Sequence, residues 1–177
     1  MKNNRTSTIA LGGICLALTV IFMFAGSIVP GIELTLFAIS SLFTAIMIIE
    51  AGVGGGIILF AAAVLLGFFI MPNKLALIPY AFFFGYYGIV KFFIEKINSG
   101  ILQIIIKTVF FAIVLCVGFL CFKELLLGSI NLPDYPVWIL IIAGILMMIL
   151  YDYIFTFLIN FYLRRIKHKG ADNMKLS

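Results

Sequence analysis

The side chains that could do chemistry in this sequence are few, and most stand inside long apolar runs. Asp152 is the clearest case, because it lies about 18 Å along a helix from the basic cluster that starts at Arg164. A charge in hydrocarbon is costly, so it marks either function or a buried ion pair. The functional alternative places Asp152 and the neighbouring Tyr151 in a solute or coupling site. The structural alternative pairs Asp152 with Lys91 or Lys107, which would fix helix packing.

A second candidate is an aromatic stripe around Gly85. Tyr80, Phe84, Tyr87 and Lys91 recur at helical spacing and share one helix face, where they could line a pocket. Aromatic stripes in membrane helices also form packed core, so both interpretations stay open. Pro79 is expected to bend this helix near its outer end.

Polar and aromatic residues also gather in and beside the loops expected on the outer side: Glu33, Asn73, Lys74, Asn131, Asp134, Tyr135 and Trp138. A shallow pocket closed by the first, third and fifth loops could be built from them. The simpler alternative is an interfacial belt of Trp and Tyr with solvated charges, and it is favoured for Tyr135 and Trp138 taken alone.

The sequence contains no recognisable catalytic constellation. It has no nucleophile beside a base, no H-E-x-x-H, and no pair of membrane carboxylates at helical spacing. The glycine run Gly54–Gly56 lacks the Lys-Ser/Thr of a phosphate loop. The three Cys residues are scattered in apolar runs and are interpreted as small hydrophobes. We therefore expect no enzyme, no metal site and no cofactor, and any uphill transport must draw its energy from a partner or an ion gradient.

The composition places these residues in a membrane. Of 177 residues, 64% are hydrophobic and only 11% are charged, against roughly 45–50% and 25% in soluble proteins. At about 20 apolar residues per span, the length allows six helices and no soluble domain beside them. Intrinsic disorder and a nucleic-acid-binding domain are excluded.

Six apolar runs separated by Pro, Gly and polar residues predict six helices in a single membrane domain over 1–177. The expected ranges are 7–29, 34–50, 54–71, 75–95, 101–122 and 137–163. The second and third runs are the shortest, so a re-entrant or tilted pair over 33–71 is the alternative for them.

The basic residues predict that both termini are cytoplasmic, because short loops rich in Lys and Arg stay inside. The inner set is Lys2, Arg5, Lys91, Lys96, Lys107, Arg164, Arg165, Lys167, Lys169 and Lys175, which leaves Lys74 and Lys123 outside. The cluster at 164–169 is most simply an anchor that meets anionic headgroups. It also explains much of the net charge of +5.

The first helix carries a small-residue patch. Gly13 and Ala17 are four residues apart on one face, a pattern that lets a second helix approach closely. This patch, the basic start and the run Thr8–Leu18, in a six-helix chain of under 180 residues, resemble the substrate-binding S components of energy-coupling-factor transporters. Those are small proteins of the bacterial plasma membrane that capture vitamins or related micronutrients.

The resemblance implies a mechanism and partners. The patch Gly13-xxx-Ala17 would touch the coupling helices of a shared transmembrane T subunit, whose two ATPases supply energy. A pocket facing outward, capped by the first and third outer loops and walled by the last three helices, would bind a small polar-aromatic or heterocyclic solute. Two alternatives remain: a non-transporting scaffold similar to the MreD proteins of cell-shape machinery, and a stand-alone ion-coupled carrier that uses Asp152.

Overall fold

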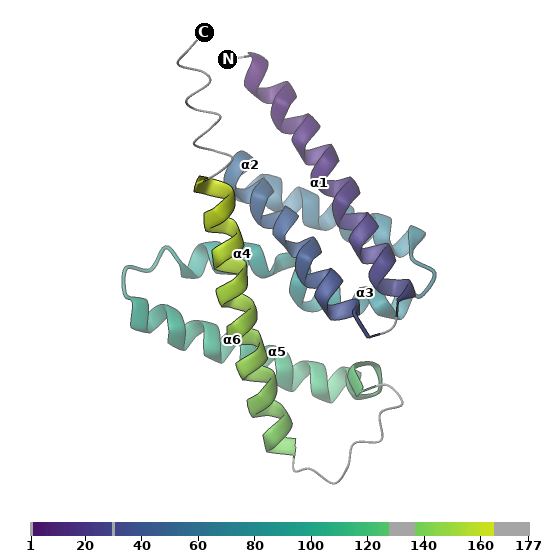
Figure 1. The fold of residues 1–177 in the computed structure, drawn as a ribbon, viewed down its shortest axis with the longest axis vertical. Helices are drawn as coiled ribbons and strands as arrows, with labels where there is room; N and C mark the ends of the chain where they lie inside the picture. Colours follow the sequence, from purple (N-terminus) through teal and green to yellow (C-terminus); the bar gives the residue numbers. More distant parts are fainter. Residues whose placement is uncertain (1, 30, 128–136, 165–177) are drawn as a thin grey trace. The chain divides into compact units, whose positions relative to one another are not determined.

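The computed structural model describes residues 2–29, 31–127 and 137–164, and over these residues it contains helices and no strand. The elements are α1 (Lys2–Ile28), α2 (Glu33–Ile70), the 3₁₀ turn η1 (Lys74–Ala76), α3 (Leu77–Pro79), the π-helix η2 (Tyr80–Phe84), α4 (Gly85–Ile94), α5 (Gly100–Leu127) and α6 (Val137–Tyr162) (Figure 1). The prediction of an all-α protein is confirmed for this part of the chain. The chain divides into two compact units, Met1–Lys96 and Ile97–Ser177, and each is described by itself.

Within the described residues, five helices are long and apolar enough to cross a membrane. They are Thr6–Ile28, Glu33–Ile70, Lys74–Ile94, Gly100–Gly118 and Gly144–Tyr162. Each has a stretch of at least 18 residues with strongly positive mean hydropathy and at most two charged side chains. The chain is therefore a multi-pass helical membrane protein.

Helix α2 is not one straight rod, because Gly52 interrupts it. Gly52 has φ 76° and ψ −179°, a conformation that is essentially confined to glycine. Phe37 and Ala63 contribute to one core cluster, although a straight helix would hold them about 39 Å apart. The two halves of α2 thus fold back at Gly52, and Figure 1 shows the darker and lighter blue halves meeting at a sharp turn near the α2 label. The runs expected at 34–50 and 54–71 fall on either side of this reversal.

The core of unit 1 is built in two layers. One cluster contains Met23 of α1, Phe37 and Ala63 from the two halves of α2, Met71, Leu77 and Tyr80. The second cluster contains Cys15, Met47 and Leu59. Because each cluster draws on α1 and both halves of α2, these segments run antiparallel. The junctions between α1 and α2 and between α2 and η1 therefore lie at the same end of the unit, which we call the loop end, and Gly52 lies at the other.

The run expected over 75–95 is helical but not regular. Pro79 has no N–H to donate, and the π-helix of Tyr80–Phe84 follows directly after it. A π-helix changes the rotation of the side chains after it relative to a regular α-helix. Gly88 of α4 then packs against Ala45 of α2, so the last segment of unit 1 returns along the first half of α2.

Unit 2 is built on an antiparallel pair of helices. Leu115 of α5 packs over Gly144 of α6, and Lys107 of α5 contacts Asp152 of α6. The two helices therefore run in opposite directions. Along α6, side chains such as Leu146, Leu150 and Phe157 remain exposed, as expected for a surface that meets lipid.

Candidate functional site

Asp152 forms an ion pair with Lys107. The Lys107 Nζ and Asp152 Oδ2 atoms are 2.8 Å apart, and the two side chains are 13% and 16% exposed. The Thr156 hydroxyl donates a hydrogen bond to the Asp152 backbone oxygen, and the Tyr151 ring packs edge-on against Phe155. The two charges balance each other inside unit 2 and hold α5 against α6.

Lys91, the other partner considered from the sequence, pairs within its own helix turn. Its Nζ lies 2.7 Å from Oε1 of Glu95, four residues later, and its side chain is almost fully buried. Within unit 2, the geometry therefore gives Lys107 as a partner of Asp152. It also places a second cation inside the apolar part of the chain, at the end of unit 1 opposite the loop end.

The aromatic stripe of the fourth run lies in the core of unit 1. Tyr80 and Tyr87 are fully buried, and Phe84 is half-buried. The Tyr80 and Phe84 rings both pack against Phe37, with centroid distances of 6.4 and 6.5 Å. In this structure the stripe is packing surface between the fourth run and α2, which is the core interpretation of the pattern.

Unit 1 buries a group of hydroxyl side chains, called here the hydroxyl band, that the sequence did not point to. Its members are Thr19, Ser40, Ser41, Thr44 and Tyr80. Thr19 donates to the Cys15 oxygen and Ser40 to the Phe37 oxygen, so these two are satisfied within their own helices. The available signal was the spacing of Ser40, Ser41 and Thr44 on one side of an otherwise apolar helix.

Thr44 and Tyr80 differ from the rest of the band. Their hydroxyls are neighbours, yet neither makes a hydrogen bond of normal geometry with the residues the structure describes. A buried hydroxyl without a partner is costly, and each of these two has the other close by. In the described part of the chain, no three His, Cys, Asp or Glu side chains come together as metal ligands would.

Three of the polar residues expected on the outer side do gather at the loop end of unit 1. Glu33 Oε2 accepts a hydrogen bond from the Gly31 N–H at 2.9 Å. Asn73 Oδ1 accepts from the Leu75 N–H at 3.1 Å and caps η1. Lys74 Nζ lies 4.7 Å from the centre of the Phe68 ring. Asn131, Asp134, Tyr135 and the side chain of Trp138 lie outside the described residues.

The small-residue patch of α1 faces outward from unit 1. Gly13 and Ala17 are both exposed, and a Cβ added at Gly13 would meet nothing within 4 Å. The neighbouring Gly12 differs, because a Cβ there would lie 3.3 Å from Cε of Met47. The Gly13–Ala17 face is thus left open by its own unit.

Comparison with protein-family models, with curated proteins and with solved structures finds no match. Two features of the described residues bear on function: the open face of α1 and the polar loop end of unit 1.

Proposed function

We propose that this chain is the substrate-capture S component of an energy-coupling-factor importer in a bacterial plasma membrane. It binds a small vitamin-like solute and works with a T subunit and two ATPases. The observation that carries the proposal is the exposed Gly13–Ala17 face of α1. This face has the residue sizes, the spacing and the open space that close contact with a partner helix requires.

Gly67 of α2 supports this interpretation by contrast. A Cβ added at Gly67 would lie 2.8 Å from Met23 and 2.9 Å from Leu77, so that glycine serves internal packing. Gly13 has no such role within its unit. A small residue at an uncovered position on a membrane helix is explained by a second helix that comes close to it.

The proposed topology has six crossings with both termini in the cytoplasm. A straight helix of 38 residues would measure about 57 Å, nearly twice the roughly 30 Å thickness of the hydrocarbon core. The reversal at Gly52 divides α2 into halves that each match the bilayer. With α1, the run Lys74–Ile94, α5 and α6, this gives an even number of crossings. The loop end of unit 1 then faces outward and presents Glu33, Asn73 and Lys74 to the solute.

Reporter fusions test this topology. A fusion after Ser177 is expected to give a cytoplasmic signal, and an insertion within 128–132 an external one, because basic residues concentrate on the cytoplasmic side. Alkaline phosphatase and green fluorescent protein fusions report the two sides. The same signal from both positions would contradict the six-crossing topology and the outward orientation of the loop end.

Co-purification tests the proposed partner. Gly13→Val and Ala17→Leu are each expected to reduce recovery of the T subunit and the ATPase pair about tenfold, or about 1.4 kcal/mol of association free energy. Retention of the solute should be unchanged, because nothing within 4 Å of an added Gly13 Cβ is disturbed. Leu18→Phe is the matched control, since this exposed position lies about 100° around α1 from Ala17.

The same experiment separates the alternatives. Recovery of cell-shape proteins with the wild-type chain would favour the MreD-like scaffold, and solute uptake without any partner would favour an ion-coupled carrier. Loss of the folded protein in both α1 variants would mean that the patch packs internally. Mass spectrometry of small molecules retained by the wild-type protein would identify the solute.

A further inference from the structure

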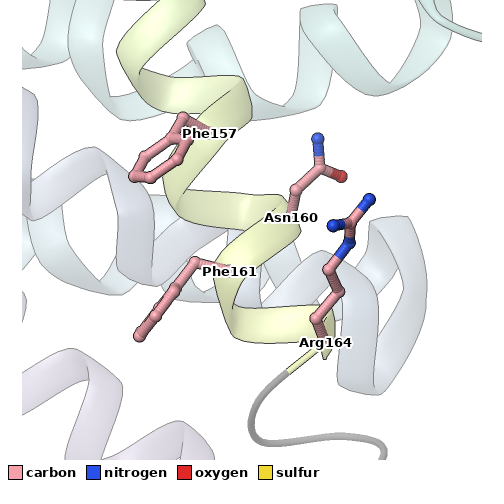
Figure 2. A pocket seen from close by; sticks show the side chains of 4 residues that line it. All are labelled: Phe157, Asn160, Phe161 and Arg164. Atoms are coloured by element: carbon pink, nitrogen blue, oxygen red, sulfur yellow. The ribbon is translucent and has the colours of Figure 1, made fainter.

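The end of α6 carries a hollow of about 330 Å³ that the proposed function does not use. It is lined by Phe157, Asn160, Phe161 and Arg164, which recur at helical spacing. In the view of Figure 2 the Phe157 and Phe161 rings point to the left of α6, and the Asn160 amide and the Arg164 guanidinium point to the right. The site is therefore mostly apolar, with a smaller hydrogen-bond-donating part formed by Asn160 and Arg164.

The two polar side chains, Asn160 and Arg164, suit a phosphate group. Guanidinium groups bind phosphate oxygens through two parallel N–H bonds, and the Asn160 amide adds a neutral donor one helical turn earlier. The sequence has no Asp or Glu between Asp152 and Asp172, whereas Arg165, Lys167 and Lys169 follow directly. Positive charge at this end of α6 is thus locally uncompensated along the chain.

The apolar surface of the site continues along α6. Phe161 and Phe157 are 52% and 61% exposed, and the exposed side chains go on through Tyr153 to Leu150. From Phe161 to Leu150 the helix rises about 16 Å, which is close to half of the roughly 30 Å hydrocarbon thickness. A soluble phosphate would leave this surface unused, whereas an acyl chain of one leaflet matches its length.

We propose that this hollow is a binding site for one anionic phospholipid. Arg164 and Asn160 donate hydrogen bonds to the phosphate, and an acyl chain lies over Phe161 and Phe157. The site is independent of the solute and of the T subunit. It goes beyond general attraction of a basic tail to headgroups, because it assigns the contact to an uncharged amide and two aromatic rings.

Native mass spectrometry of the full chain in mild detergent tests the site, with dioleoyl phosphatidylglycerol and dioleoyl phosphatidylcholine as probes. The wild type is expected to retain the anionic lipid in preference. Arg164→Gln should reduce that preference about tenfold and Asn160→Ala about threefold, the latter without a change in net charge. Lys96→Gln is the matched control, because Lys96 is also an exposed cation beside aromatic rings, those of Phe92 and Phe93. It should change the preference less than about twofold.

Three results would overturn the proposal. Equal losses in Lys96→Gln and Arg164→Gln would mean non-specific charge attraction, and equal retention of both lipids in the wild type would mean no headgroup recognition. Displacement of the anionic lipid by soluble glycerol phosphate would assign the site to a soluble anion. Circular dichroism of each variant confirms that the fold is intact, and Asn160→Ala keeps the test decisive if Arg164→Gln does not fold.

Discussion

Asp152→Asn is expected to lower the free energy of unfolding by about 3 kcal/mol. The change removes the anion that lies 2.8 Å from the Lys107 ammonium, whose side chain is only 13% exposed. The cation then stays in a poorly solvated position and loses the charge of Asp152. The double variant Asp152→Asn with Lys107→Met should recover most of the loss, because no buried charge remains.

Unfolding of the four proteins of this cycle in SDS, followed by circular dichroism, gives the coupling energy directly. Lys74→Met is the control for loss of a cation, since Lys74 is exposed and lies over the Phe68 ring; it should cost no more than about 1 kcal/mol. An Asp152→Asn protein that is as stable as the wild type but no longer retains the solute would reverse the interpretation. Asp152 would then act on the solute, with Tyr151 beside it.

Gly85→Val is expected to destabilise unit 1 by about 3 kcal/mol. A Cβ at Gly85 would lie 2.5 Å from two ring carbons of Phe60 and 2.9 Å from the Tyr80 ring. These rings also contact each other, with centroids 6.4 Å apart, so neither can move freely. Close packing of this kind resists added volume more strongly than a surface does.

Gly13→Val is the matched control for that substitution. It makes the same chemical change in another helix, at a position where an added Cβ meets nothing within 4 Å. Thermal unfolding in detergent should therefore separate the two variants clearly, with Gly13→Val close to the wild type. Similar losses of stability in both variants would contradict the open face of α1 and with it the proposed partner contact.

Apolar periodicity and punctuation predict the helical ranges well, because long hydrophobic runs have few alternatives in a bilayer. The break near Gly52 is signalled by the glycines from Gly52 to Gly56, which need no tertiary information to mark a boundary. The π-helix after Pro79 is different. Its position depends on how Tyr80 packs against Phe37 and Phe60, which are distant in sequence.

The candidate sites also depend on contacts between residues that are distant in sequence. The sequence identifies Asp152 as a charge that needs an explanation, but it leaves Lys91 and Lys107 as equal partners. The Lys107–Asp152 contact depends on the antiparallel register of α5 and α6, which also places Leu115 over Gly144. The hollow at Arg164 was missed because its residues look ordinary one by one, as lipid-facing aromatics and a basic anchor.

The Lys107–Asp152 pair also bears on how the chain enters the membrane during synthesis. An isolated charge in hydrocarbon costs up to roughly 2.5–3.5 kcal/mol at the bilayer centre on insertion scales, and α5 and α6 would each carry part of that cost alone. Once the 2.8 Å contact has formed, the two helices present a neutral pair to the lipid. The insertion machinery is therefore expected to hold α5 until α6 has been made, and to release both as one helical hairpin.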